Sequence, residues 1–202
     1  MLRVIICGFF MMAITACGTT PGDAAFQGGH YSQAAELYEA KANLGDPLAA
    51  QKLGNLYNHR PGLPEDHQKA VYWYERAIQL GDKASNWMIG VIYRDGKGNV
   101  PKDYMLAAKY FLQGAEAGQH YSMYDLAGMY AENLIEVSND IEGLKWMNIV
   151  TAYAAKYPKS NEGGQYILRD PKNVRGTLES RMTDQQKRTA AQLADYWMSN
   201  HE

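Results

Sequence analysis

One pattern of residues recurs along this chain at a nearly fixed offset, and it constrains the fold more than any other feature. Three kinds of position keep a spacing of 36 or 37 residues. These positions are a tyrosine (Tyr57, Tyr93, Tyr130), a second aromatic residue (Trp73, Tyr110, Trp146) and a glycine (Gly45, Gly81, Gly118). Because a fold with a single core needs no such period, the shared spacing predicts a stack of structural repeats.

The clearest copy of the unit spans residues 83–118. Its first part carries an apolar stripe that includes Ile89 and Ile92, and its second part begins after a potential helix cap at Asp103. Between the two parts lies a loop that contains glycines and a proline, and Gly118 ends the unit. The pattern therefore predicts two helices joined by a turn, and the glycines of the loop are explained by turn geometry rather than by phosphate binding.

The same signals predict helices elsewhere along the chain. Proline in the first turn opens a helix at 47–58, Asp66 caps the next one, and a third unit starts at His120. The predicted helices outside the complete units lie at 31–44 and, after the capping box of Thr183 and Gln186, at 183–199. The stretch 156–182 loses the period, and we interpret it as an irregular connection or a degenerate repeat.

The repeated pattern A-x-x-x-L-G-x-x-Y, a loop, then D-x-x-x-A-x-x-W-Y-x-x-A-x-x-x-G resembles the Sel-one-like repeat (SLR), a relative of the tetratricopeptide repeat. The resemblance covers a half repeat at 31–46 and repeats at 47–82, 83–118 and 119–155. In the third repeat Ala127 replaces the glycine of the pattern. The resemblance implies an all-α, right-handed α-solenoid of antiparallel helix hairpins, for which a helix at 183–200 would form the C-terminal cap.

Two glycines lie in the middle of predicted helices, where glycine costs about 1 kcal/mol relative to alanine. These residues, Gly54 and Gly90, occupy the same position in successive repeats. We expect them to allow close approach of the two helices in a hairpin, with Tyr57 and Tyr93 packing on the partner helix. The aromatic residues at the repeat positions are accordingly expected in the core.

The N-terminus carries the features of a targeting segment. Arg3 precedes the almost wholly apolar stretch 4–14, which ends in Ile-Thr-Ala-Cys, a sequence that resembles the bacterial lipobox. The resemblance implies a signal peptide at 1–16 and lipid attachment at Cys17; the alternative is an ordinary signal peptide with an incidental cysteine. The segment 17–30 would then be a lipid-anchored tether, flexible at 18–22 and with a short helix expected at 23–27. Gly18 after the cysteine favours the outer membrane, so we expect a lipoprotein that carries palmitate and faces the periplasm.

Composition and motifs argue against several kinds of chemistry. Lys and Arg number 20 and Asp and Glu number 22, so no strong field of one sign points to nucleic acid or to a polybasic membrane surface. The five histidines show no metal-binding spacing, and cleavage before Cys17 would leave no other thiol. We therefore predict no catalytic residues, no metal and no cofactor.

The family resemblance also implies a concave surface lined by positions on the first helix of each repeat. Trp87 and Tyr124 are large residues for a surface exposed to water, and such residues dominate binding hot spots. An alternative is that Trp87 simply packs between repeats. The candidate partner-binding groove consists of Gln51, Asn55, Asn58, Trp87, Val91, Arg94, Tyr121, Tyr124, Gly128 and Glu132.

These observations favour a non-enzymatic lipoprotein whose solenoid binds a protein or peptide partner in its concave groove. A narrower hypothesis is an immunity protein that neutralises a secreted toxin of the phospholipase type, as some bacterial lipoproteins with these repeats do. A third hypothesis is a structural factor of the cell envelope. Some family members have been linked to β-lactam binding or hydrolysis, but this chain lacks the cysteine pairs of that subgroup.

Overall fold

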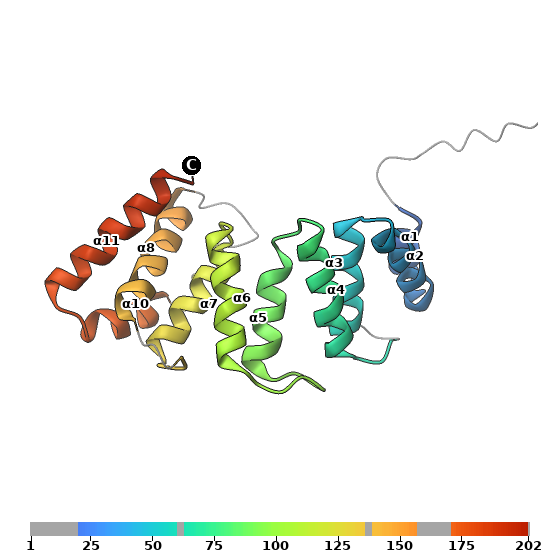
Figure 1. The fold of residues 1–202 in the computed structure, drawn as a ribbon, viewed down its shortest axis with the longest axis horizontal. Helices are drawn as coiled ribbons and strands as arrows, with labels where there is room; N and C mark the ends of the chain where they lie inside the picture. The colour runs from blue at the N-terminus through green and yellow to red at the C-terminus, as the bar shows by residue number, and fades with distance from the viewer. Residues whose placement is uncertain (1–19, 60–62, 136–138, 157–170, 202) are drawn as a thin grey trace, which may run out of the picture.

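A computed structural model describes residues 20–59, 63–135, 139–156 and 171–201. The helices stand side by side in a row, with α1 and α2 at one end and α11 at the other (Figure 1). The predicted signal peptide at 1–16 and the predicted lipid attachment site, Cys17, lie outside the described residues.

The structure confirms the all-α solenoid, since the described residues form helices and include no strand. Antiparallel hairpins pair α3 with α4, α5 with α6 and α7 with α8, and each hairpin packs against the next. The helices are α1 (Pro21–Gln27), α2 (Tyr31–Asn43), α3 (Pro47–Asn58), α4 (His67–Gln79), α5 (Ser85–Asp95), α6 (Tyr104–Glu116), α7 (His120–Ala131), α8 (Asp140–Lys156), α10 (Pro171–Ser180) and α11 (Asp184–Ser199).

The sequence signals for helix ends have the expected conformations. The carboxylates of Asp66 and Asp103 accept hydrogen bonds from backbone N–H groups in the first turns of α4 and α6. The glycines that recur between hairpins have positive φ, 92° at Gly45, 104° at Gly81 and 87° at Gly118. Because this conformation is strained for other residues, these three glycines fix the turn from each hairpin to the next.

The mid-helix glycines of the first two hairpins allow the close approach of the two helices that was predicted, and the residues above them are the aromatic rings of Tyr74 and Phe111. A Cβ atom on Gly54 would lie 2.7 Å from the ring of Tyr74, and one on Gly90 would lie 2.5 Å from the ring of Phe111. Tyr74 and Phe111 are both fully buried. Close packing of α3 on α4 and of α5 on α6 therefore requires a residue without a side chain at these two positions.

The aromatic residues at the repeat positions divide into two groups. Trp73 and Trp146 are buried in the core, at 7% and 0% exposure, as predicted. Tyr93 and Tyr110 are only half-buried, and their rings stack with centroids 6.0 Å apart. Tyr57 and Tyr130 are also half-buried and pack against the edges of core clusters.

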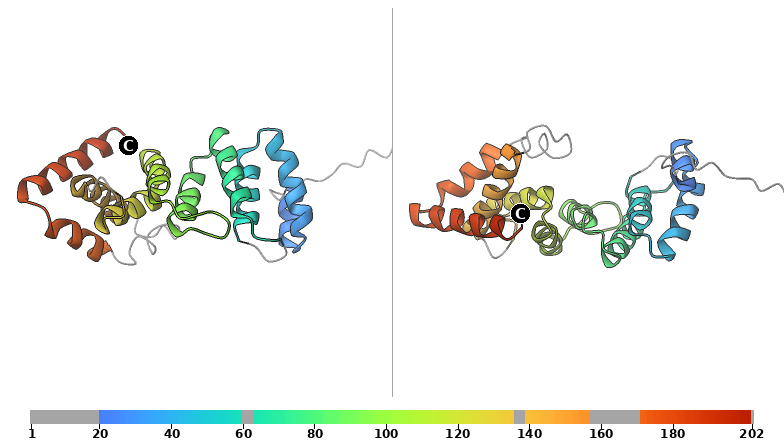
Figure 2. Two further views of the ribbon diagram at one scale, coloured as in Figure 1. Left: turned by 60° about the horizontal axis from the view of Figure 1, so that its bottom comes forward. Right: turned by 90° about the horizontal axis from the view of Figure 1, so that it is seen from above.

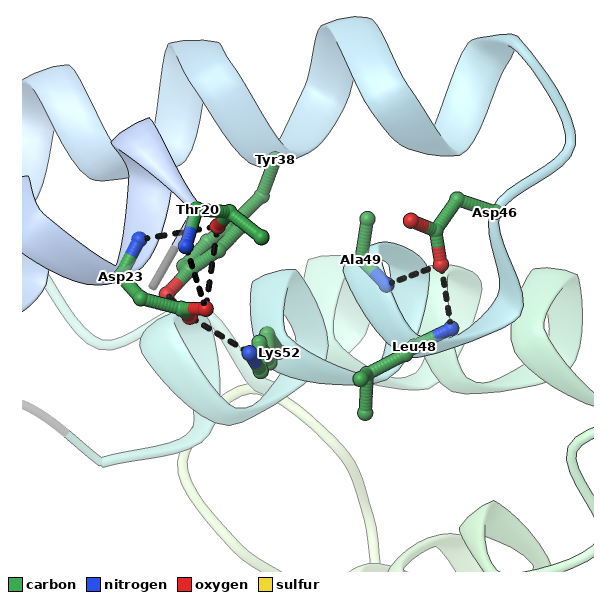
Figure 3. Close-up of polar contacts among 7 residues, drawn as sticks. All are labelled: Thr20, Asp23, Tyr38, Asp46, Leu48, Ala49 and Lys52. Carbon is green, nitrogen blue, oxygen red and sulfur yellow. Dashed lines mark hydrogen bonds and ion pairs between the residues drawn. The ribbon is translucent and has the colours of Figure 1, made fainter. Parts of the chain in front are cut away.

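Within the tether predicted at 17–30, the short helix expected at 23–27 is present as α1, and this helix packs against α2. The Thr20 side chain caps this helix by accepting a hydrogen bond from the Asp23 backbone N–H, and the Asp23 carboxylate accepts one from the Thr20 backbone N–H. The carboxylate of Asp23 also accepts a 2.7 Å hydrogen bond from the Tyr38 hydroxyl on α2 and pairs with Lys52 on α3 (Figure 3). The Lys52 ammonium and the Tyr38 hydroxyl hold the pKa of Asp23 well below its ordinary value.

At the other end, α11 packs along α8, the last helix of the repeats (Figure 2). Ala190 and Ala194 are buried there, and the rings of Trp146 and Trp197 meet edge to face at 5.7 Å. The capping box of Thr183 and Gln186 begins the helix, as predicted.

The stretch 156–182 is not irregular throughout, because α10 is a helix that packs against α7 and α8. Leu178 of α10 is fully buried and lies close to Gly143 of α8. The middle of the stretch, 157–170, lies outside the described residues. In the part that the structure describes, no helix is both long and apolar enough to span a bilayer.

Candidate protein-binding surface

A buried carboxylate joins the second and third hairpins at the junction of their first helices. Asp125 on α7 is only 7% exposed. Its carboxylate accepts a hydrogen bond of 2.6 Å from the indole N–H of Trp87 on α5. It also forms an ion pair with the guanidinium of Arg94 on α5, with 2.8 Å between nitrogen and oxygen. A buried carboxylate is stable only when paired and hydrogen-bonded, so these contacts fix both α5 side chains to α7.

Other contacts hold the same two side chains in place. The Nε atom of Arg94 donates to Asp95 at 2.8 Å, and its guanidinium lies 5.8 Å from the centre of the Phe111 ring. The ring of Trp87 lies 5.2 Å from the ring of Tyr121 on α7. Aromatic and guanidinium groups held in fixed orientations are the groups that contribute most to protein interfaces, because little side-chain entropy remains to be lost on binding.

The structure thus brings together three predicted groove residues, Trp87, Arg94 and Tyr121, around a residue that the sequence analysis missed. Asp125 occupies the position of Lys52 in the first repeat and Met88 in the second. Because the residue at this position differs between repeats, the repeat pattern did not mark Asp125 as functional. Its spacing of four residues from Tyr121 was the one available indication, since it places both side chains on the same side of the helix.

Two of the predicted groove residues of the first repeat form hydrogen bonds with the scaffold. Gln51 donates its amide to Asp82 at 3.1 Å, and Asn55 accepts a 2.7 Å hydrogen bond from the hydroxyl of Tyr74. Asn58 is half-buried, and its side-chain carbonyl oxygen finds no hydrogen-bond donor among the described residues. The contacts of Gln51 and Asn55 run to the second helix of the hairpin or to the following turn, not to another first helix.

The remaining predicted residues lie further along the same two helices. Val91 and Tyr124 are half-buried and pack against the core cluster of the second and third hairpins. Glu132 is exposed at the end of α7. The candidate surface is therefore the α5–α7 face, which we define as Trp87, Val91, Arg94, Tyr121, Tyr124 and Asp125.

A separate cavity of about 560 Å³ lies near the ends of α8 and α11. His120 lines it and stacks on Tyr153 with ring centroids 3.3 Å apart. Burial lowers the pKa of His120 to about 4, so its imidazole is neutral at pH 7. Within the described ranges, no three histidine, cysteine or acidic side chains come together as metal ligands.

Comparison with known proteins places the repeats in a family. The model of the Sel1 repeat matches residues 47–82, 83–119 and 120–149. The first two matches enclose the α3–α4 and α5–α6 hairpins, and the third covers α7 and the part of α8 up to residue 149.

Two curated relatives come from Arabidopsis thaliana. The ERAD-associated E3 ubiquitin-protein ligase component HRD3B is 30% identical over 96 residues, which is 47% of this chain and 15% of the relative. The related component HRD3A is 34% identical over 64 residues, or 31% of this chain and 9% of the relative. The chain thus spans only a small part of the length of either relative.

Solved structures show the same fold. A protective antigen of uropathogenic Escherichia coli strains with an SLR fold superposes with a TM-score of 0.65 and 27% identity, covering 83% of this chain and 33% of the antigen. A Sel1 repeat protein from Oxalobacter formigenes superposes with a TM-score of 0.55 and 24% identity, covering 74% of this chain and 64% of that protein.

Proposed function

Because the chain belongs to the Sel1 repeat family, whose model matches three consecutive segments of it, we propose that it is a non-enzymatic protein that binds a protein or peptide partner. The partner binds the α5–α7 face. The observation that carries this proposal is the set of contacts at Asp125, which holds Trp87 and Arg94 in fixed positions at the junction of two hairpins.

The relatives support the class of function but not the identity of the partner. By their names, HRD3A and HRD3B are components of a ubiquitin ligase, which implies that they work in association with other proteins. The matched region is a small share of each relative, so only the general role of the repeats, protein binding, is carried over to this chain.

We also propose that the protein is a lipoprotein anchored through Cys17 in the outer membrane and facing the periplasm. The support is the apolar stretch followed by Ile-Thr-Ala-Cys at 14–17. Metabolic labelling with a palmitate analogue in bacterial cells should label the wild-type chain and leave a Cys17→Ala variant unlabelled. Equal labelling of the two chains would contradict the anchor without affecting the proposed binding surface.

Photocrosslinking in cells tests the binding surface directly. A benzoyl-phenylalanine at Tyr124, on the α5–α7 face, should capture one predominant partner. The same probe at Tyr196, which is 72% exposed on α11, provides a matched control because it also replaces a tyrosine on a helix of the solenoid. Capture of the same partner with equal yield from both positions would contradict the proposal.

The identity of the captured protein separates the narrower hypotheses. A secreted phospholipase would support an immunity protein, and a constituent of the cell envelope would support a structural factor. Incubation of the delipidated domain with a β-lactam reporter should give neither hydrolysis nor acylation; either result would contradict the non-enzymatic proposal.

A further inference from the structure

A second cleft lies on another part of the solenoid, between α4 and the segment that connects α5 to α6. Its volume is about 350 Å³. The cleft is lined by Val71, Tyr72 and Glu75 of α4, Tyr93 of α5, and Val100 and Pro101 of the connecting segment. None of these six belongs to the α5–α7 face.

Glu75 places a carboxylate in this cleft. Its Oε1 atom accepts a 2.6 Å hydrogen bond from the hydroxyl of Tyr110. Burial, together with the hydrogen bond to Glu75, raises the pKa of Tyr110, so the phenol keeps its proton and remains a donor. Tyr110 therefore orients the carboxylate, but because Tyr110 is neutral it does not itself compensate the negative charge of Glu75. No lysine, arginine or histidine within the described ranges forms an ion pair with Glu75.

Aromatic and aliphatic groups form the walls around that charge. Tyr72 is 59% exposed, and Tyr93 is held in place by stacking on Tyr110 with nearly parallel rings, 8° apart. Val71 and Val100 are buried, at 7% and 5% exposure, and present apolar surface at the base of the cleft.

The wall formed by the connecting segment is fixed to α4. The side-chain amide of Gln68 donates to the carbonyl of Asn99 at 3.2 Å. The side-chain amide of Asn99 donates in turn to Asp66, the N-terminal cap of α4, at 3.1 Å. The cleft is consequently formed before any ligand arrives, which reduces the entropy lost on binding.

The repeats provide an internal comparison that separates this site from the requirements of the fold. Thirty-seven residues later, Leu112 occupies the position of Glu75 and Lys109 occupies the position of Tyr72. Both replacements lie on α6, which packs in its hairpin as α4 does. Since the solenoid accepts an exposed leucine and a lysine at these positions, packing does not require the glutamate and the tyrosine.

We propose that this cleft binds the cationic side chain of a lysine or arginine on a protein partner. The ammonium or guanidinium group pairs with the Glu75 carboxylate and lies against the faces of Tyr72 and Tyr93, whose ring quadrupoles attract cations. The methylene groups of the same side chain contact Val71, Val100 and Pro101. The site does not rest on the α5–α7 face, and a partner can engage either surface alone.

Nuclear magnetic resonance titration with n-butylguanidinium tests the site without knowledge of the partner. The probe carries the charge and the methylene chain of arginine, whereas n-butylurea has a similar shape but no charge. We expect saturable shifts at the Val100 backbone amide and the rings of Tyr72 and Tyr93 with the cation, and shifts at least about fivefold smaller with the urea.

Two glutamate variants complete the test. Glu75→Gln keeps the shape of the side chain and should weaken binding of the cation by about tenfold. Glu116→Gln removes a charge from an exposed position on α6 and should leave binding unchanged. Equal binding of cation and urea, undiminished binding to Glu75→Gln, or the absence of saturable shifts in the wild-type chain would overturn the proposal. None of these outcomes bears on crosslinking from Tyr124, so the two proposals fail independently.

Discussion

The second and third hairpins have the same architecture but pack their helices with different pairs of residues. In the second hairpin Gly90 leaves room on α5 for the ring of Phe111 on α6. In the third hairpin Ala127 and Met147 occupy the equivalent positions, and both are fully buried in one core cluster. Relative to the second hairpin, the third therefore has an added methyl group at Ala127. In place of the rigid phenylalanine ring it has the flexible, unbranched side chain of Met147.

The connecting turns differ in a parallel way. Gly96 has a φ of 65° at the end of α5, and its counterpart after α7 is Asn133, with a φ of 52°. Asparagine is among the few residues other than glycine that adopt this conformation at modest cost. The two hairpins show that the repeat depends on paired volumes and backbone conformations rather than on particular residue types.

The largest effect should come from adding one methyl group to the second hairpin. Gly90→Ala places a Cβ atom against the Phe111 ring, and such overpacking costs about 2–3 kcal/mol even after the gain in helix propensity. We expect the thermal midpoint to fall by about 5–10 °C. Adding Phe111→Met, which reproduces the pair of the third hairpin, should recover at least about 1 kcal/mol.

Gly128→Ala is the matched control for that change. Gly128 also lies on the first helix of a hairpin, but an added Cβ would meet nothing within 4 Å. The control should stabilise the protein by about 0.5–1 kcal/mol, because alanine favours the helix. A stable Gly90→Ala variant, or a double variant no better than the single one, would refute the paired-volume interpretation.

A second prediction concerns the bridge between the two hairpins. Asp125→Ala removes the acceptor for Trp87 and the ion-pair partner of Arg94. Because Arg94 is partly exposed, we expect a loss of about 2 kcal/mol in the free energy of unfolding rather than the larger cost of a fully buried pair. Urea denaturation followed by circular dichroism measures it. Asp184→Ala, at an exposed position in the first turn of α11, should change stability by less than about 0.5 kcal/mol.

The third hairpin offers the reciprocal exchange. Met147→Phe should cost about 1–2 kcal/mol, because the ring would compete with the Ala127 methyl group for space. Ala127→Gly added to this variant should relieve the crowding while losing about 1 kcal/mol of helix propensity. A double-mutant cycle should therefore give a coupling energy of about 1 kcal/mol in favour of the pair. Strict additivity of the two changes would mean that these positions do not compensate each other.

The hairpins should also differ in their response to acid. The third begins with the half-buried His120, and the second has the exposed Lys83 at the equivalent position. Burial lowers the pKa of His120 from 6.5 in the unfolded chain to about 4 in the folded protein, so the folded state takes up this proton only at lower pH. The free energy of unfolding should thus decrease as the pH falls from 6.5 to 4, by about 1 kcal/mol for a half-buried ring.

Thermal melts of the wild-type chain and of His120→Gln across this pH range measure that contribution. The variant should lose most of the pH dependence above pH 4. The lowered pKa of Asp23 contributes stability that is lost only below about pH 4, where its unfolded carboxyl titrates, so the two effects occupy different windows. An unchanged slope in His120→Gln would contradict the assignment.

The smallest effect should come from the turn after α7. Asn133→Ala should cost about 0.5–1 kcal/mol relative to Asn133→Gly, because both variants lose the amide but only alanine is strained at positive φ. Denaturation midpoints of the two variants provide the comparison. Equal midpoints would show that the backbone conformation at 133 does not limit this hairpin.

Much of the fold was predictable because the repeat period carries information that a single helix does not. The three-fold recurrence of glycine and aromatic residues located the hairpins, and Asp66 and Asp103 located helix starts. The short helix at 23–27 was predicted, but its attachment to the solenoid was not, because the contacts of Asp23 with Tyr38 and Lys52 join residues far apart in the sequence, which no local signal reveals. The same limit applies to α10, which is held by tertiary packing of Leu178.

The binding surface was predictable only in part. Positions on the first helices follow from the repeat, and so Trp87, Arg94 and Tyr121 were identified. Which of them come together depends on Asp125, at a position whose residue type differs in every repeat. In the first repeat, the hydrogen bond that Asn55 accepts from Tyr74 was not predictable, because it depends on the close packing of that hairpin.

The central claim is that the α5–α7 face binds the partner, whereas the packed pairs inside the hairpins only support it. The most direct test measures affinity for the partner captured at Tyr124, below the melting temperature of each variant. Tyr124→Ala should weaken binding by at least about tenfold, as expected for a hot-spot residue. Gly54→Ala, which crowds the ring of Tyr74 in the first hairpin, should lower the thermal midpoint but leave the affinity within about twofold. Undiminished affinity of Tyr124→Ala, or an equal loss in both variants, would contradict the claim.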